Sequence, residues 1–267
     1  MPQYWLTRKA LLAGAFFVAG WLAALQAQAA CDLQHVDERA SADYVYDGDT
    51  LRLTDGRRLR FVGLDTPEMG RDGRPGEPYA RAARERLIEL LNDQDHRLAL
   101  QYDRERRDRH GRLLAHPALA DGSNLTEVLL REGLATQLVV PPNTGLLDCY
   151  AAAEAEARRA GRGIWSLPAY APRPTASLPK DAEGFHILQG RVERIGRGRH
   201  TLWLNLEGRV AVKIGEEDYV HFGDRDWDAL TGRRIEVRGW LHPRRDGSRM
   251  LRLRHPAALN LLGEANS

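Results

Sequence analysis

A short apolar run that ends in Asp65-Thr66-Pro67-Glu68 most constrains how this chain can fold. The apolar residues of the run are Leu59, Phe61, Val62 and Leu64. Two carboxylates therefore stand at the exit of a predicted strand, where a rigid sheet can direct them at a ligand. Pro67 fixes its own φ and disfavours the helical region for Thr66, so the turn is stiff. Taken alone, the stretch is better explained as a strand-ending turn that Asp65 caps.

The first thirty residues are typical of a secretory signal peptide. A basic pair precedes the apolar run 10–25, and Ala27-Gln28-Ala29 supplies small residues for cleavage near Ala29 or Ala30. The apolar run is shorter than the ~20 residues that span a bilayer, so an uncleaved anchor is a weaker alternative. A lipoprotein attached through Cys31 is a further weak alternative. We therefore predict a periplasmic or secreted protein without a stable membrane partner, acting as a monomer.

The chain has only two cysteines, Cys31 and Cys149. In an oxidising compartment two such cysteines tend to pair, and export favours pairing over two unrelated thiols. A disulfide between them would close a long loop, which contributes about 4 kcal/mol in the chain-entropy account. It would also fix the N-terminal segment of the mature chain.

The overall charge excludes one class of nucleic-acid-binding protein. The formal net charge is +2, and removal of the signal peptide takes away two basic residues and no acidic ones. The mature chain is therefore not a polycation that binds nucleic acid through bulk charge. Any surface that binds phosphate must be local.

Apolar periodicity predicts an α+β order of elements in the first half of the chain. Alternating apolar residues predict strands between 44 and 65 and at 97–102 and 113–119. Helical spacing with capping signals predicts helices at 79–91, 124–133 and 147–159. Strands, a helix, strands and two helices in this order predict a small β-barrel of the oligonucleotide-binding (OB) type with three helices packed on it.

The second half of the chain predicts a second, mostly β, OB-like barrel. A proline-rich segment, 168–182, is expected to be a stiff linker between a domain at 31–167 and a domain at 183–264. The later domain carries about five short alternating stretches, at 185–195, 201–206, 209–214, 233–241 and 249–253. This likeness of fold assigns no function.

Three aromatic residues of the second domain, Trp203, Trp240 and Phe222, could form stacking surfaces for bases. Positions in the core or at a strand edge explain them better. The domain also has no acidic pair at the spacing of metal ligands.

Oxygen ligands for a hard cation can be assembled from two turns of the first domain. Asp47-Gly48-Asp49-Thr50 precedes a predicted strand, and its glycine lets the backbone bend, although for this tetrapeptide alone an Asx-turn is the better explanation. Asp49 and Asp65 can offer carboxylates, and Thr66 can offer its backbone carbonyl. Ca²⁺ accepts such ligands, in a shell of ~6–8 oxygens. The absence of His and Cys from this set argues against zinc.

Groups suited to phosphodiester chemistry accompany these ligands. Glu68 lies on the same turn and can hold or deprotonate a water. Arg60 and Arg112 can bind a phosphate bidentately and stabilise charge that builds on its oxygens. Arg60 lies five residues before Asp65, so simple alternation places the two on opposite faces. We therefore expect a bulge or twist near Gly63.

Together these motifs resemble the staphylococcal nuclease (thermonuclease) family. The matching residues are Asp-Gly-Asp-Thr at 47–50, Arg60, Asp-Thr-Pro-Glu at 65–68, Asp-x-x-Gly-Arg at 108–112 and Ile164-Trp165-Ser166. The resemblance implies an exported, calcium-dependent endonuclease that cleaves phosphodiester bonds of single-stranded DNA or RNA and leaves 3′-phosphate ends. It implies that Asp49, Asp65 and Thr66 bind Ca²⁺, that Glu68 is the general base, and that Arg60 and Arg112 bind the phosphate.

The chain also departs from the family pattern. Two tyrosines that contact the nucleotide usually follow the position of Gly133-Leu134-Ala135, and here the segment 137–142 has none. His110 replaces the tyrosine of the Gly-Arg turn, where it could contact substrate or be a plain surface residue. A barrel that binds nucleic acid in the cell envelope without cutting it is the alternative function. Retention of all the acidic and arginine positions favours the enzyme.

Overall fold

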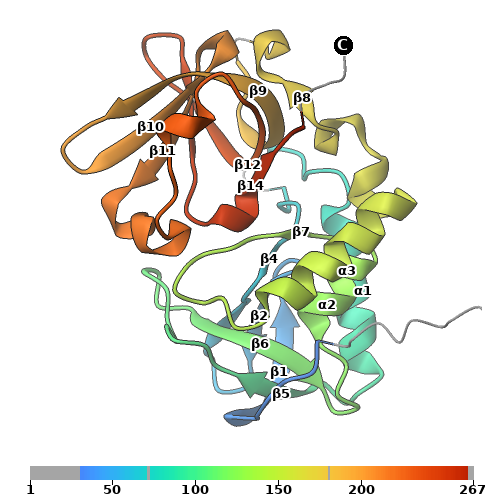
Figure 1. Cartoon of the computed structure of the whole chain (residues 1–267). Helices are drawn as coiled ribbons and strands as arrows, with labels where there is room; N and C mark the ends of the chain where they lie inside the picture. Colours follow the sequence, from blue (N-terminus) through green and yellow to red (C-terminus); the bar gives the residue numbers. More distant parts are fainter. Residues whose placement is uncertain (1–30, 71–72, 180, 264–267) are drawn as a thin grey trace, which may run out of the picture.

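The computed structural model describes residues 31–70, 73–179 and 181–263. The predicted signal peptide, residues 1–30, lies outside these residues. No helix within the described ranges is both long and apolar enough to span a membrane. Two β-barrels, one from each half of the chain, lie one above the other in Figure 1.

The first barrel closes through five strands in the order β1-β2-β3-β6-β5. Their bounds are β1 Glu38–Val45, β2 Thr50–Leu53, β3 Arg58–Phe61, β5 Arg97–Gln101 and β6 Leu113–Leu119. Alternate side chains such as Leu51, Leu59 and Phe61 are almost fully buried in its core. Strands β3 and β6 pair in parallel, with Leu59 opposite Leu113, and this brings the turn before β6 next to the strand that carries Arg60.

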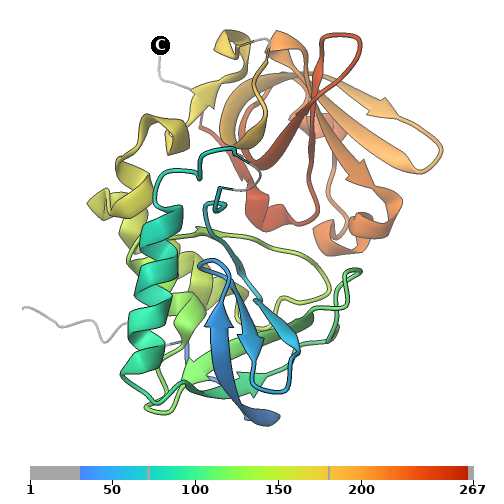
Figure 2. The ribbon, with the colours of Figure 1, turned by 180° about the vertical axis from the view of Figure 1, so that it is seen from behind.

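Three helices pack on the outside of this barrel, as Figure 1 and, from behind, Figure 2 show. Their bounds are α1 Ala80–Asn92, α2 Leu125–Arg131 and α3 Leu147–Ala160. Helix α1 buries Ala83, Leu87 and Leu91, which recur at helical spacing. Asn124 caps α2 by accepting a hydrogen bond from the Glu127 N–H at 3.2 Å. The predicted α+β fold, an OB-type barrel with three helices, is confirmed.

A disulfide joins Cys31 to Cys149 across 118 residues of sequence. The backbone of Cys31 is held as well, because its N–H donates to Glu127 Oε2 at 2.7 Å and its carbonyl accepts from Asn124 Nδ2 at 2.8 Å. The disulfide and these two hydrogen bonds attach the start of the described chain to α2 and α3.

The second barrel confirms the predicted second, mostly β, unit. Its sheet has the order β14-β12-β13-β11-β10-β9-β8, and β12 also pairs with β9, which closes the ring. The bounds are β8 Arg173–Pro174, β9 Gly184–Arg197, β10 Thr201–Leu206, β11 Val210–Gly215, β12 Arg234–Pro243, β13 Arg249–Arg252 and β14 Leu259–Leu261. Short 3₁₀ helices complete the chain: η1 Gly163–Ser166, η2 Pro168–Tyr170, η3 Thr175–Ser177, η4 Glu207–Arg209, η5 Glu216–Phe222, η6 Asp228–Leu230 and η7 Pro256–Ala258.

The segment that we expected to be a stiff linker is folded onto the second barrel. Strand β8 pairs in parallel with β9, where Arg173 lies opposite Leu188. Thr175 is only 1% exposed, because it packs closely against Gly190 and Gly208. Proline-rich composition predicted a stiff segment, but it did not predict the pairing of Arg173–Pro174 with a strand.

A buried ion pair connects the two barrels. Arg238 of β12 pairs with Glu154 of α3, and their side chains are 11% and 5% exposed. Arg238 Nη2 also donates to Gln137 Oε1 at 2.9 Å, while the Gln137 N–H donates to Glu154 Oε1 at 2.6 Å. The barrels are therefore held in one arrangement by groups that water does not reach easily.

We expect reduction of the disulfide to lower the free energy of unfolding by up to about 4 kcal/mol, because a long loop in the unfolded chain is released. Urea unfolding with and without reductant measures this. A variant with Cys31→Ser and Cys149→Ser is the control, since its stability should not respond to reductant. Equal stability of the oxidised and reduced protein would contradict the expectation.

The variant Arg238→Ala should lose about 3 kcal/mol of stability, because it leaves the Glu154 carboxylate buried without its partner. The double variant Arg238→Met with Glu154→Leu should recover much of this loss, since both charges are then absent. Thermal unfolding of the single and double variants tests the pair. A double variant as unstable as Arg238→Ala would show that packing or the hydrogen bonds to Gln137, rather than the unpaired charge, account for the loss.

Candidate active site

Asp49 lies in the turn that leads into β2 and is only 5% exposed. Its Oδ1 accepts a hydrogen bond from Thr50 Oγ1 at 2.9 Å, and its Oδ2 accepts from the Thr66 N–H at 2.9 Å and from Thr66 Oγ1 at 3.0 Å. Gly48 makes this approach possible, since a Cβ there would lie 2.7 Å from both Ala83 and Thr66. The Asp-Gly-Asp turn is thereby packed directly against the Asp65-Thr66 turn.

The guanidinium of Arg60 lies between two carboxylates. One nitrogen pairs with Asp49 Oδ2, and Nη2 donates to Asp65 Oδ1 at 2.7 Å and to the Leu64 carbonyl at 3.2 Å. The side chains of Arg60, Asp49 and Asp65 are 12%, 7% and 17% exposed. Charges removed from water to this extent interact strongly, so each of the three constrains the positions of the others.

A twist at Gly63 brings Arg60 and Asp65 onto the same side. Gly63 has a φ of 92°, and after it β4 (Leu64–Asp65) leaves the barrel to pair with β7 (Thr136–Gln137). A Cβ at Gly63 would lie 2.4 Å from the Tyr150 ring, so space as well as backbone conformation requires glycine. Strand alternation does not apply between Arg60 and Asp65, because they belong to different sheets.

Arg112 is held by the carboxylate of Asp108 in the turn before β6. Arg112 Nε donates to Asp108 Oδ2 at 2.7 Å, and the N–H groups of His110 and Arg112 donate to Oδ1 at 2.8 and 2.9 Å. Burial opposes ionisation of Asp108, but the bonds from Arg112 and His110 outweigh it and lower the pKa of this carboxyl. Asp108 thus stays charged and orients Arg112.

Arg60 and Arg112 line one cleft of about 530 Å³. Asp108, Arg109 and His110 also line it, as do Arg252 and Arg254 from the second barrel. The cleft therefore has one wall from each half of the chain, and arginines occur on both walls.

The remaining predicted site residues are Thr66, His110 and Glu68, and only His110 lines the cleft. The Thr66 side chain and N–H are bonded to Asp49, and His110 lines the cleft as an exposed residue. Glu68 is exposed, and its N–H donates to Glu77 Oε2 at 2.8 Å. Glu68 is not among the described residues that line the cleft.

The donor set fits a hard cation, because Asp49 and Asp65 present two carboxylates to a single positive group, the Arg60 guanidinium. In the part of the chain that the structure describes, no cluster of three or more His, Cys, Asp or Glu side chains could hold a metal ion. A bound ion would therefore depend on these two carboxylates with backbone and water oxygens, as Ca²⁺ allows.

A second hollow of about 390 Å³, which our sequence reasoning missed, adjoins the cleft. It reaches from Asp65 to Phe185, Trp240 and His255. We expected Trp240 to be a core or edge residue, but it is 38% exposed and lines this hollow. Phe222, by contrast, is 8% exposed and belongs to the core. The alternation of residues along one strand could not predict what surrounds Trp240, because part of the second hollow is formed by residues of the first barrel.

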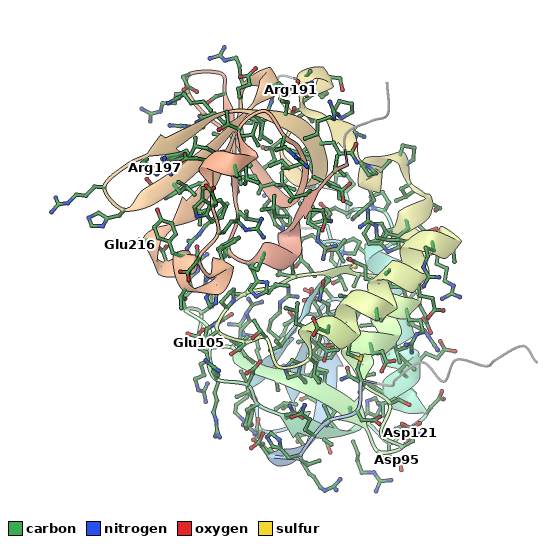
Figure 3. All side chains as sticks on the ribbon, in the orientation of Figure 1. Asp95, Glu105, Asp121, Arg191, Arg197 and Glu216 are labelled. Carbon is green, nitrogen blue, oxygen red and sulfur yellow. A yellow bond between two sulfur atoms is a disulfide. The ribbon has the colours of Figure 1, made fainter. Side chains whose placement is uncertain are left out.

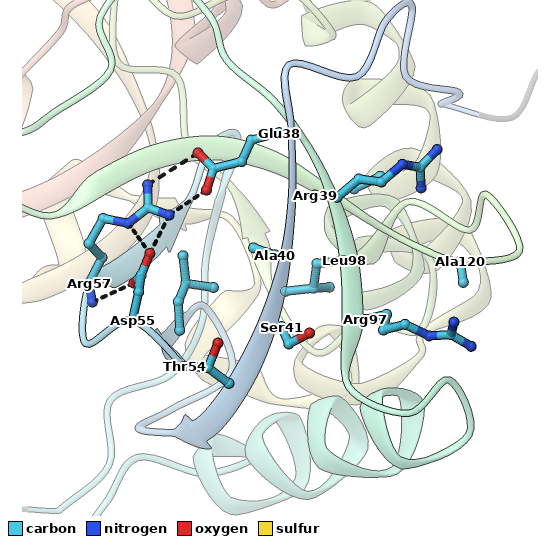
Figure 4. A pocket seen from close by; sticks show the side chains of 12 residues that line it. Glu38, Arg39, Ala40, Ser41, Thr54, Asp55, Arg57, Arg97, Leu98 and Ala120 are labelled. Carbon is cyan, nitrogen blue, oxygen red and sulfur yellow. Dashed lines mark hydrogen bonds and ion pairs between the residues drawn. The ribbon is translucent and has the colours of Figure 1, made fainter.

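A separate hollow of about 430 Å³ on the first barrel is a structural feature (Figure 4). Arg57 lines it and donates to Asp55 Oδ2 at 2.6 Å and to Glu38 Oε2 at 3.1 Å. Both carboxylates are thus engaged by Arg57 within the first barrel, and none of the predicted site residues lines this hollow.

Comparison with known proteins agrees with the geometry. The family described as staphylococcal nuclease homologue matches residues 58–167. The chain is 38% identical over 124 residues to a thermonuclease of Staphylococcus intermedius, which is 45% of this chain and 72% of that protein. It is also 38% identical over 133 residues to two endonucleases of Bacillus subtilis, YokF and YncB. That match covers 48% of this chain but only 44% and 62% of those relatives.

The variant Arg60→Gln should destabilise the protein by about 2–3 kcal/mol, because the Asp49 and Asp65 carboxylates lose the cation between them. The loss should fall below the ~3–5 kcal/mol of a fully buried pair, since Asp65 retains some contact with water. Urea unfolding measures it. Arg58→Gln is the matched control, because Arg58 is exposed on the same strand and should change stability by less than about 0.5 kcal/mol. Equal effects of the two changes would refute the role given to Arg60.

Proposed function

Because the chain belongs to the staphylococcal nuclease homologue family, we propose that it is an exported, calcium-dependent endonuclease that hydrolyses phosphodiester bonds of DNA and RNA. One observation carries the proposal. Arg60 and Arg112 line a single cleft, and Asp49 and Asp65 lie directly against Arg60. This places groups for a phosphate next to groups for a cation.

The two arginines are the proposed phosphate-binding groups. Asp108 engages Arg112 through Nε, so the terminal nitrogens of Arg112 are the atoms that we propose donate to a phosphate. Paired guanidiniums match the tetrahedral oxygens of a phosphate and stabilise the additional negative charge of the transition state.

Arg60 can bind a phosphate only when its guanidinium leaves Asp49 and Asp65. The two carboxylates, which are mostly buried, then require another positive charge. We propose that Asp49, Asp65 and the Thr66 carbonyl hold Ca²⁺ at this point. A bound Ca²⁺ supplies electrostatic stabilisation of the phosphate oxygens.

Glu68 is the proposed general base. Pro67 stiffens the turn between Asp65 and Glu68, and the backbone of Glu68 is fixed by its bonds to Glu77. A water attacks phosphorus, its proton passes to the Glu68 carboxylate, and the bond to the 5′ oxygen breaks while that oxygen takes up a proton from solvent water. By resemblance to the family, the products would carry 3′-phosphate and 5′-hydroxyl ends.

Export is part of the proposal, supported by two features. The first thirty residues have the composition of a signal peptide, and the Cys31–Cys149 disulfide suits an oxidising compartment. We propose a periplasmic or secreted location, with single-stranded DNA or RNA as substrate and the monomer as the working unit.

Each of the variants Arg60→Ala, Arg112→Ala and Glu68→Gln should lower kcat by about 10²–10³, because each removes a group that acts in the transition state. Initial rates on single-stranded DNA in calcium measure this. Arg104→Ala is the matched control, since Arg104 is an exposed arginine in the segment before the Asp108–Arg112 turn. A variant with nearly normal turnover would remove that residue from the mechanism.

The same assay separates an enzyme from a binding module. The wild-type protein should cut in calcium and stop cutting when a chelator is added. Binding without any cleavage in calcium would favour the non-catalytic alternative.

A further inference from the structure

We propose that the second barrel forms the other wall of the substrate-binding groove, with Arg254 as a phosphate-binding residue and Trp240 as a base-stacking residue. This inference rests on the proposed nuclease function, and it specifies the substrate as a single, unpaired strand several nucleotides long. The strand would run from Arg60 and Arg112 to Trp240.

The two hollows share part of their lining, and together they mark the path that we propose for the strand. Five residues line both of them, namely Arg109, Leu138, Val140, Arg252 and Arg254. The first hollow contains Arg60 and Arg112, and the second extends to Phe185 and Trp240. A strand whose phosphate lies at Arg60 would therefore continue over these shared residues towards Trp240.

Arg254 is better suited than its neighbour Arg252 to bind a phosphate. Arg252 Nη2 is paired with Glu217 Oε1 at 2.6 Å and with Asp218 Oδ2 at 2.8 Å. Arg254 contacts Asp218 more loosely, with its buried Nε 3.6 Å from Oδ1, and this Nε has no hydrogen-bond partner among the described residues. Its side chain is 36% exposed, so the terminal nitrogens are the atoms that we propose donate to a phosphate. Asp218 contacts both arginines but is only 2% exposed, so the surface that the second barrel presents to the strand is basic.

Trp240 is suited to stacking because its side chain is exposed on the path. It is 38% exposed and stands opposite Phe185 in the pairing of β12 with β9. The segment Thr136–Val140, which lines the opposite wall of the second hollow, has no aromatic residue. Stacking on an aromatic face needs a base that is free of its Watson–Crick partner, which selects an unpaired strand.

The second wall is held rigidly in place. Arg238, which pairs with Glu154 of α3, lies two residues before Trp240 on β12. Both residues line the second hollow, so the pair that joins the barrels also fixes the position of Trp240. A fixed wall loses little conformational entropy when a strand binds.

Fluorescence anisotropy in calcium, with a fluorescein-labelled 12-nucleotide single-stranded DNA whose phosphorothioate linkages resist cleavage, tests the inference. Trp240→Ala and Arg254→Gln should each weaken binding about tenfold, and Trp240→Phe should restore most of the affinity. Arg254→Gln should also lower the slope of log K against log salt by about 0.7. The charge control is Arg191→Gln, because Arg191 is exposed on the far side of the second barrel (Figure 3).

Cleavage of a dinucleotide in calcium keeps this inference distinct from the proposed function. Trp240 lines the second hollow and not the cleft of Arg60 and Arg112, so Trp240→Ala should cut a dinucleotide bound in that cleft at the wild-type rate. Wild-type affinity for the 12-mer in folded Trp240→Ala and Arg254→Gln, verified by thermal unfolding, would overturn the inference whatever the enzyme cuts. Failure of the wild-type protein to cut either substrate would refute the proposed function, and the binding data would still decide the role of the second barrel.

Discussion

The contact of one arginine with two carboxylates is the interaction on which the candidate site depends. Arg60 comes from β3, Asp49 from the turn before β2 and Asp65 from β4, so the contact joins three consecutive segments of the first domain. All three side chains are largely shielded from water, where an unpaired charge is costly. If Arg60 moves towards a phosphate, the Asp49 and Asp65 carboxylates lose their positive partner. Their negative charge then favours binding of another cation.

The second barrel is connected to the Asp49–Asp65 pair through β7 of the first domain. Gln137 of β7 accepts a hydrogen bond from Arg238 of the second barrel, and β7 pairs with β4, which carries Asp65. A short path of backbone and side-chain contacts thus runs from the interface to the acidic pair. The segment 168–179 reinforces this arrangement, because its strand β8 pairs with β9 of the second barrel.

Local sequence signals predicted a large part of this structure. The spacing of Ala83, Leu87 and Leu91 marked α1, and Asn124 marked the start of α2, because helix periodicity and capping are properties of neighbouring residues. The chain has only two cysteines, so a single intramolecular disulfide was the prediction, and the structure contains it. The order of the predicted strands and helices was sufficient to predict two OB-like barrels, because few arrangements of these elements bury their apolar faces.

Tertiary structure alone decided how the site is assembled. The sequence by itself determined which residues carry charge and which turns hold Asp49, Asp65 and Arg112. It also predicted a bulge or twist near Gly63, but it could not show that β4 leaves the barrel there to pair with β7, because that pairing joins residues far apart in the chain. It could not show that Trp240 lines the second hollow either, because the orientation of one barrel on the other follows from a long-range buried pair, Arg238 with Glu154. Contacts between residues far apart in the chain leave no periodic signal in the sequence.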